Sequence, residues 1–285
     1  MIMDVLKRRI DEYAAENAME QENVLQEIMQ HYVLASLSRA GFFTRAIFHG
    51  GTCLRIINGT NRFSEDLDFV LKRPDSTFCW HPYLEKVQED CHREGIEFEA
   101  ADKSKAESVV QKAFLKTGSI GQILSFNFPF NRHNSKKIKI KLEIDTNPPA
   151  GSRFETSYIT FPSIAVITTQ TLESGFAGKA HALLCRKYVK GRDWYDYIWY
   201  VSQKIQPNFE LLQNALFQQG PWAEKKIAVT REWFLESLET VIRHINWDTA
   251  IQDVQRFLPV NEQLSIREWN MDFFLYLTNK FKGTI

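Results

Sequence analysis

Apolar residues along this chain recur with two different spacings, and the change from one to the other falls near residue 165. Before that point, helical segments are mixed with short runs that alternate between apolar and polar positions, which is typical of strands with one buried face. After it, apolar residues recur every three or four positions, which is typical of helices. The pattern therefore predicts an α+β part over residues 1–165 and a mostly helical part over residues 166–285.

The individual elements follow from the same two periods. Strands are expected at residues 44–49, 65–71, 138–145 and 164–168, with less regular strands between 96 and 130. Helices are expected at residues 3–16, 21–40, 82–94, 207–217, 221–243, 247–257 and 264–279. Thr169 is expected to cap a helix that reaches about residue 188, and Gly191 to interrupt the chain before a helix that starts at Asp193.

Two aspartates stand at the start of the second strand, in the sequence SEDLDFVL. Because side chains on a strand alternate between its faces, Asp66 and Asp68 project to the same side. Two neighbouring carboxylates repel each other, and a bound divalent cation removes that repulsion. The pair is therefore a candidate metal site, with a solvated strand face as the alternative.

A glycine pair precedes these aspartates and follows a strand, in the sequence IFHGGTCLR. Backbone N–H groups of such a turn, at the start of a helix, suit phosphate. Gly50, Gly51 and Thr52 are therefore candidate phosphate-binding residues, although a glycine pair alone is more often a simple turn. Gly51 lies only 15 residues before Asp66. Phosphate and metal sites on adjacent elements indicate chemistry on a nucleoside triphosphate.

A third carboxylate is expected on the polar face of the strand at residues 138–145. Nucleotidyl transfer can use two metal ions about 4 Å apart, bound by hard oxygen ligands. Glu143 and Asp145 both lie on that face, and the alternation does not choose between them. Asp145 is slightly favoured because it is nearer the strand end, where a site can open. The alternative is a solvent-facing strand in which Lys139 and Lys141 balance these acids.

Three residues near the aspartates have polar side chains with more than one interpretation. Ser64 can donate a hydrogen bond to a phosphate oxygen, or it can serve as a turn hydroxyl. Arg62 can neutralise a triphosphate, or it can cap the loop. Arg55, on the helix after the glycine pair, can equally brace Glu65 or another acid.

A second charged block is the stretch GKAHALLCRKYVKGRDWYDY. Lys179 and Arg186 are seven residues apart on a predicted helix and share a face, and both side chains suit phosphate groups. Asp193 and Asp196, three residues apart on the next predicted helix, also share a face. The alternatives are that Asp193 is a helix cap and that Arg192 and Asp196 form a surface pair.

Four blocks together resemble the AbiEii/AbiGii family of toxins, also known as MenT-like toxins, within the nucleotidyltransferase superfamily. The blocks are GGTCLR, RFSEDLDF, KIKLEIDTNPP and GKAHALLCRKYVKGRDWYDY, and they span roughly residues 40–200. The C-terminal third has no motif that we match. The resemblance implies a polymerase-beta-like nucleotidyltransferase core, a mixed sheet with flanking helices, followed by a helical half that completes the active-site cleft.

The resemblance also implies roles for individual residues. The metal ligands would be Asp66, Asp68 and Asp145, with Glu143 as the alternative to Asp145. A lysine and an aspartate that are associated with activity in the family match Lys179 and either Asp193 or Asp196. The residues that would contact the nucleotide are Gly50, Gly51, Thr52, Arg62, Ser64, Lys179 and Arg186.

The function implied by the resemblance is a toxin of a toxin–antitoxin, or abortive-infection, system. It would use Mg²⁺, or Mn²⁺ in its place, to transfer NMP from an NTP to an RNA acceptor, with tRNA as the expected acceptor and a cognate antitoxin as protein partner. Two alternatives remain open. One is AMPylation-like modification of a protein, and the other is a non-catalytic, NTP-binding interaction module.

Charge and composition limit the functions that the sequence allows. The 35 basic residues equal the 35 acidic residues, so overall charge does not indicate tight, nonspecific binding to nucleic acid. A local basic patch consists of Lys136, Lys137, Lys139 and Lys141 with Arg132 nearby. It would position RNA phosphates, or it is a solvated edge strand. No signal peptide or membrane-spanning run is evident, and four scattered cysteines favour a cytoplasmic protein.

Overall fold

The computed structural model describes residues 8–93, 96–102, 119–131 and 134–283. The contacts between residues divide the chain into two compact units. The first consists of Met1–Gly59, Phe63–Pro148 and Thr156–Thr169, and the second of Thr60–Arg62, Pro149–Glu155 and Gln170–Ile285. The last division therefore falls after residue 169, whereas the sequence pattern places it at 165. Two short segments of the N-terminal part belong to the second unit.

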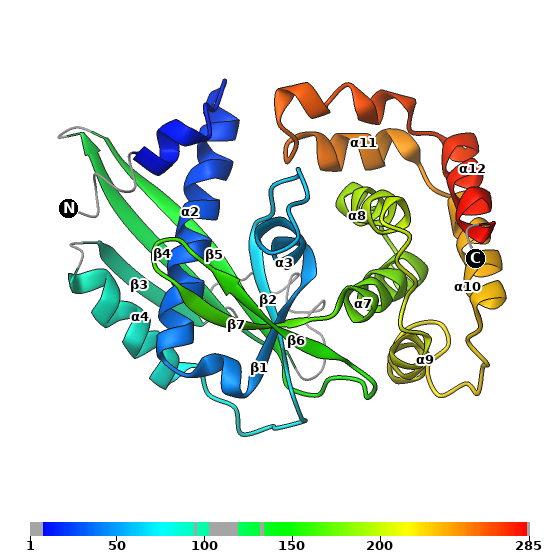
Figure 1. The fold of residues 1–285 in the computed structure, drawn as a ribbon, viewed down its shortest axis with the longest axis horizontal. Coiled ribbons are helices and arrows are strands. Elements are labelled where there is room, and N and C mark those ends of the chain that lie inside the picture. The colour runs from blue at the N-terminus through cyan, green and yellow to red at the C-terminus, as the bar shows by residue number, and fades with distance from the viewer. Residues whose placement is uncertain (1–7, 94–95, 103–118, 132–133, 284–285) are drawn as a thin grey trace. The chain divides into compact units, whose positions relative to one another are not determined.

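A mixed sheet forms the centre of the first unit (Figure 1). Within the described residues it has seven strands, in the order β3-β4-β5-β2-β1-β7-β6. The strands are β1 (Ala46–His49), β2 (Asp66–Leu71), β3 (Glu97–Asp102), β4 (Ser119–Asn131), β5 (Asn134–Asp145), β6 (Phe154–Ile159) and β7 (Ala165–Gln170). β2 runs antiparallel to β1 and parallel to β5, and β1 runs parallel to β7. The predicted mixed sheet is confirmed.

Helices of the first unit pack against this sheet. They are α2 (Ala18–Arg39), α3 (Gly50–Ile56) and α4 (His81–Arg93), while residues 8–12 form the described part of an earlier helix. α2 contacts α4 and β5, and α3 contacts β1 and β2. Asn17 caps α2 by accepting hydrogen bonds from the backbone N–H groups of Met19 and Glu20.

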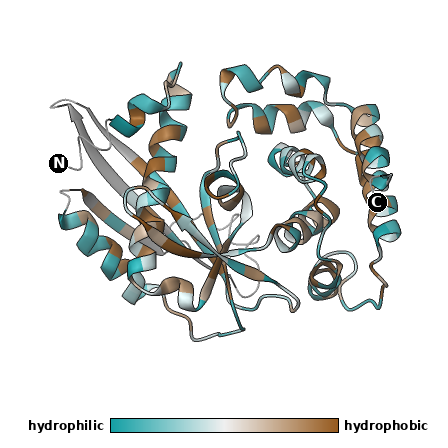
Figure 2. Cartoon of the chain, in the orientation of Figure 1, coloured by the Kyte–Doolittle hydropathy of each residue, from teal (hydrophilic) through white to brown (hydrophobic). Residues whose placement is uncertain are grey.

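The buried residues of the sheet come from the apolar positions of the alternating strands. Leu67 and Phe69 of β2 and Leu142 of β5 are almost inaccessible to solvent. Phe42, before β1, joins them in an aromatic cluster, with its ring centroid 4.9 Å from that of Phe69 and 5.3 Å from that of Trp80. Figure 2 shows this concentration of hydrophobic residues in the central strands. The carboxylates of the same strands therefore lie on the polar side of a rigid layer.

The second unit is helical, as the sequence predicts. Its α-helices are α7 (Leu172–Cys185), α8 (Gly191–Ser202), α9 (Phe209–Gln218), α10 (Arg231–Ile242), α11 (Trp247–Gln255) and α12 (Met271–Lys282). Aromatic rings fill its core: Phe176 stacks on Tyr200 with centroids 4.6 Å apart, and Trp247 stacks on Phe274 at 4.1 Å. The aromatic residues of α8 are therefore part of the helix packing.

Four details differ from the sequence-based expectations. Thr169 is a buried residue of β7, and Thr171 caps α7 instead, by accepting a hydrogen bond from the Ser174 backbone N–H. Strand β6 was not expected, because it lacks a regular buried face. The helix expected over residues 221–243 begins only at Arg231. β5 lies between β4 and β2, and Lys141 pairs with a residue on each side, so this lysine of the basic patch is not at a sheet edge.

Two general properties complete the description. Within the described residues, no helix is both long and apolar enough to span a bilayer. The four cysteines all lie in the described part of the chain, and none of them is in a disulfide.

Candidate active site

The two aspartates of β2 share a face of the sheet with a glutamate of β5. In the parallel pairing of these strands, Asp68 is opposite Glu143 and Asp66 is opposite Lys141. Side chains of paired residues project to the same face of a sheet. Asp66, Asp68 and Glu143 are each half-buried, in contrast to the fully buried residues between them. The register therefore places three carboxylates on one polar face of two adjacent strands.

Asp145 lies two residues after Glu143 along β5, opposite Val70 instead of an aspartate. One of its carboxylate oxygens accepts a hydrogen bond from the Asn147 backbone N–H at 2.9 Å, so the side chain takes part in the turn that follows the strand. The strand register thus favours Glu143 as the neighbour of Asp68, although position near the strand end had favoured Asp145.

The glycine turn lies directly against one of these carboxylates. β1 ends at His49, which pairs with Asp68, and α3 starts at the next residue. Gly50 has a φ of +82°, and a Cβ built on it would come within 2.6 Å of an Asp68 Oδ2 atom. A side chain at this position would therefore be strained by the backbone conformation and would also clash with the carboxylate. Gly51 follows as the buried second residue of α3.

Hydrogen bonds from α2 and α3 hold the start of β2 and the loop before it. The buried Thr52 hydroxyl donates to the Asp66 carbonyl oxygen. That contact joins α3 to β2 and uses the hydroxyl proton, so Thr52 has a structural role in this arrangement. Gln30 of α2 donates from Nε2 to the Ser64 carbonyl oxygen at 2.8 Å, which fixes the loop before β2. Ser64 itself is half-buried.

Arg55 braces a different acid from the nearest one in sequence. Its Nε donates to Glu27 of α2 at 2.7 Å, and both side chains are largely buried. Its guanidinium also lies over the ring of Phe63, 4.5 Å from the centroid. The sequence had suggested that Arg55 braces Glu65 or another acid, and this ion pair shows that it braces Glu27.

The residues of β2 and β5 have the donor chemistry for a hard divalent cation, but their carboxylates are not drawn together. Among the described residues, no group of three or more His, Cys, Asp or Glu side chains is arranged around a common point. Residues i and i+2, such as Asp66 and Asp68, stand roughly 7 Å apart along a strand, whereas Asp68 and Glu143 are directly opposite each other on neighbouring strands. The oxygen ligands fit Mg²⁺ or Mn²⁺, and Gly50 lets the backbone pass close to the Asp68 carboxylate.

A second group of charged residues forms a buried network in the second unit. Arg62 binds Asp196 through two hydrogen bonds of 2.6 Å, and their side chains are 2% and 0% exposed. Lys179 Nζ lies 2.8 Å from Asp196 Oδ2 and 2.7 Å from Asp193 Oδ1. Arg186 Nε completes the network at 2.7 Å from Asp193 Oδ2. The network therefore alternates three cationic side chains with two carboxylates.

The charges of this network hold one another in the ionised state. Burial acts to raise the pKa of Asp196, but the charges of Arg62 and Lys179 outweigh it, and the pKa lies below its ordinary value. The pKa of Asp193 is lowered in the same way against burial, by Lys179 and Arg186. Burial acts to lower the pKa of Lys179, but the two aspartates raise it. All members are therefore charged at neutral pH.

These contacts decide several structural alternatives left open by the sequence. Arg62 forms a buried ion pair instead of capping its loop. Asp193 is buried within α8, and the N-cap residue of that helix is Lys190. Arg192 pairs with Asp253, with its side-chain Nε 3.7 Å from Oδ2 and its backbone N–H donating to the same oxygen at 3.2 Å, and Asp196 is fully buried instead of forming a surface pair. Arg132 of the basic patch lies outside the described residues.

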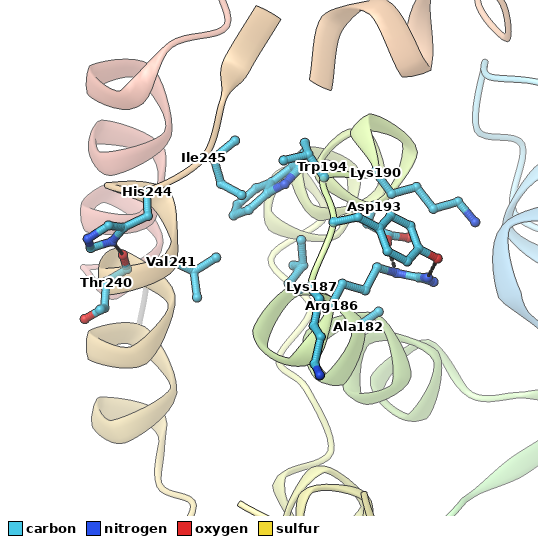
Figure 3. A pocket seen from close by; sticks show the side chains of 13 residues that line it. Ala182, Arg186, Lys187, Lys190, Asp193, Trp194, Thr240, Val241, His244 and Ile245 are labelled. Atoms are coloured by element: carbon cyan, nitrogen blue, oxygen red, sulfur yellow. Dashed lines mark hydrogen bonds and ion pairs between the residues drawn. The ribbon is translucent and has the colours of Figure 1, made fainter. Parts of the chain in front are cut away.

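A cavity of about 320 Å³ adjoins the network in the second unit (Figure 3). Arg186 and Asp193 line it together with Lys187, Tyr188 and Lys190 from the α7–α8 connection and with residues of α10. Arg186 donates from Nε to Asp193, as Figure 3 shows, and a second guanidinium nitrogen donates to the Tyr188 hydroxyl. Lys187, Tyr188 and Lys190 were not predictable as cavity residues, because a loop of mixed residues has no period that singles them out.

The overall architecture is similar to that of two solved structures. JHP933 from Helicobacter pylori matches with a TM-score of 0.50 and 15% identity, over 91% of this chain and 89% of that chain. A nucleotidyltransferase candidate from H. pylori matches with a TM-score of 0.49 and 16% identity, over 89% of each chain. At this level of identity the likeness concerns the fold. No curated protein matches the chain.

The sequence shows the class of the protein: it is a nucleotidyltransferase. The family model described as "Nucleotidyl transferase AbiEii toxin, Type IV TA system" matches residues 32–275. The chain therefore belongs to the AbiEii family of toxin–antitoxin systems, which confirms the resemblance of the four sequence blocks. The match also extends through the C-terminal third, where no motif had been recognised.

Proposed function

We propose that this nucleotidyltransferase transfers NMP from an NTP to the 3′ end of an RNA acceptor, with tRNA as the acceptor, in a reaction that depends on Mg²⁺. The observation that carries the proposal is the register of β2 and β5, which sets Asp66, Asp68 and Glu143 on one face. The close approach of Gly50 to Asp68 supports it, because it brings the backbone of the glycine turn, whose N–H groups suit phosphate, next to a candidate metal ligand.

Asp66, Asp68 and Glu143 would hold the metal ions, and we prefer Glu143 to Asp145 because of the strand register. When bound, divalent ions activate the attacking hydroxyl and neutralise charge on the triphosphate. The backbone N–H groups of Gly50 and Gly51 and the Ser64 hydroxyl would contact phosphate oxygens. Thr52 would act indirectly, because its hydroxyl already holds the Asp66 carbonyl group.

The network of the second unit would supply positive charge for the nucleotide. Arg186 is its most accessible member, with a side chain that is 32% exposed, against 13% for Lys179. We assign phosphate contact to Arg186, and to Lys179 a role in fixing both Asp193 and Asp196. Arg62 would fix Asp196 from its other side. Lys179 and the two aspartates then affect activity by orienting the cations.

The test is a transfer assay with purified protein. The protein is incubated with each α-labelled NTP, MgCl₂, total RNA and a cell extract, and the products are separated into RNA and protein. Label on tRNA supports the proposal, whereas label on protein indicates AMPylation-like chemistry. Retention of NTP without transfer of label indicates a binding module. An Asp68→Ala variant with an unchanged circular dichroism spectrum should transfer no label, and EDTA should stop the wild-type reaction.

Membership of a toxin–antitoxin family implies an antitoxin partner. We therefore propose that expression of the chain alone arrests growth through this transfer reaction. Cells that express wild type should stop growing, and cells that express Asp66→Ala to the same protein level should grow. Growth arrest by both proteins would show that toxicity does not come from the carboxylates of β2.

A further inference from the structure

A separate cavity lies in the first unit, and no carboxylate of the proposed transfer site lines it. Its volume is about 300 Å³, which is within the range of small-molecule sites. Its charged and polar walls come from distant parts of the chain: Arg9 and Tyr13 at the N-terminal end, Glu27 and His31 of α2, and Arg55 of α3. Such convergence of polar groups on one space is the first sign of a binding site.

The charge balance inside this cavity is positive. Both oxygens of Glu27 have donors, with the Tyr13 hydroxyl 2.6 Å from Oε1 and Arg55 Nε 2.7 Å from Oε2. Arg9 brings a second guanidinium. Glu12 pairs with Arg9 through NH1 at 2.6 Å, but the Glu12 side chain is 51% exposed and lies outside the lining. Two guanidinium groups therefore face a single buried carboxylate.

His31 adds polarity without adding charge. Burial is the main cause that lowers the pKa of its imidazole to about 4, and the positive charges of Arg9 and Arg55 act in the same direction against the attraction of Glu27. The imidazole is therefore neutral at pH 7, with one nitrogen that donates and one that accepts.

Two buried nitrogen atoms of the lining have no hydrogen-bond partner within the described part of the chain: His31 Nδ1 and Arg9 Nε. Buried polar atoms nearly always have partners in folded proteins. Arg9 is held in place by other means, because its guanidinium lies 5.3 Å from the ring centroid of Tyr13 and 5.4 Å from that of Phe161. Both nitrogen atoms are shielded from solvent, whereas the Arg9 side chain as a whole is 36% exposed and can contact a bound molecule through its other N–H groups.

We propose that this cavity binds a mononucleotide, with the phosphate on the Arg9 guanidinium and the base beside His31. Aromatic side chains supply stacking surfaces for a base, since Tyr13 and Phe161 line the cavity and Tyr158 lies at its rim with 65% exposure. Arginine suits phosphate and aromatic rings suit bases of any identity. This inference uses none of the residues of the proposed transfer reaction and stands independently of it.

The experiment is isothermal titration of the full chain in EDTA, which removes divalent ions from the transfer site. The probes are AMP, GMP, CMP, UMP and inorganic phosphate. We expect at least one mononucleotide to bind about tenfold more tightly than phosphate, because the base adds stacking. Arg9→Gln should weaken that binding about tenfold or more, since it removes a charge-assisted contact. Arg8→Gln is the matched control, because it removes the same charge from an exposed neighbouring position.

Further variants separate binding from folding. Tyr158→Ala changes an exposed side chain and should weaken binding while the melting temperature stays the same. Asp68→Ala should abolish transfer and leave this binding unchanged. Absence of binding by all five probes, equal affinity for phosphate and mononucleotides, or equal loss in Arg8→Gln and Arg9→Gln would each overturn the proposal. Loss of binding in Asp68→Ala would instead assign the nucleotide to the transfer site, and would overturn it as well.

Discussion

Position on the strand determines which carboxylate can take part in the proposed chemistry. Asp68 has Glu143 as its partner across β5, whereas Asp145 is opposite Val70 and accepts a hydrogen bond from a turn. Glu143 and Asp145 lie on the same face of β5, two residues apart, so the strand register alone determines which of them is next to Asp68. A bound cation needs several oxygen ligands around one point. Glu143 is therefore better placed to complete a set with Asp68.

The first prediction compares the two acids. Glu143→Gln should reduce kcat about 100-fold or more, because removal of a metal ligand removes several kcal/mol of transition-state stabilisation. Asp145→Asn should change kcat by less than about threefold, since the amide oxygen can still accept the turn hydrogen bond. Initial rates at saturating Mg²⁺ measure both. The reverse order of effects would identify Asp145 as the ligand.

The second prediction concerns the glycine beside Asp68. Gly50→Ala places a methyl group 2.6 Å from the carboxylate oxygen at a φ of +82°, so it should lower the free energy of unfolding by about 1–3 kcal/mol and abolish transfer. Gly41→Ala is the control, because Gly41 has a φ of +72° but no atom within 4 Å of the added Cβ. It should have a smaller effect on stability and none on kcat. Equal loss of activity in both variants would show that strain alone matters.

At the scale of elements, α7 and α8 are connected through largely buried ions: the side chains of Asp193 and Asp196 are 3% and 0% exposed, and that of Lys179 is 13% exposed. Arg62, from a loop of the N-terminal part, enters the same network through Asp196. Burial of each ion costs free energy, and only the full set of partners offsets it. Removal of one partner should therefore be more damaging than removal of a complete pair.

The third prediction tests that order. Arg62→Met should lower the free energy of unfolding by about 3–5 kcal/mol, because it leaves a buried carboxylate short of a partner. The double variant Arg62→Met/Asp196→Leu should lose less than Arg62→Met alone. Glu89→Gln breaks an exposed pair with Lys86 and should cost less than about 1 kcal/mol. Urea denaturation measures all three, and a double variant less stable than the single one would contradict the argument.

The same elements show what the sequence can and cannot reveal. The period of α2 and the alternation of β5 predicted those elements, because both patterns are local. The choice between Glu143 and Asp145 was not predictable, since it depends on the register between two strands about 75 residues apart. Arg62 and Asp196 are 134 residues apart, so their pairing has no local signal either. Strand β6 was missed because its side chains do not alternate between buried and exposed.

For the whole molecule, the network makes stability depend on pH in acid. The pKa values of Asp193 and Asp196 are lowered by the cations around them, mainly Lys179 and Arg186 for the former and Arg62 and Lys179 for the latter. A lowered pKa stabilises the fold above the ordinary aspartate value of about 3.9. That contribution is lost as the pH falls through the folded-state values. Stability from this source should therefore be constant between about pH 5 and 7 and decline below about pH 4.

The fourth prediction is a difference in this pH dependence between wild type and Asp196→Asn. The wild-type urea midpoint should fall steeply below about pH 4, whereas the variant should be less stable at pH 7 and should fall less steeply, because one of the two carboxylates no longer titrates. Tryptophan fluorescence suits the measurement, since Trp80 is the only one of the seven tryptophans outside the second unit. Parallel curves for the two proteins would show that Asp196 does not control the acid transition, and that the carboxylates of other elements do.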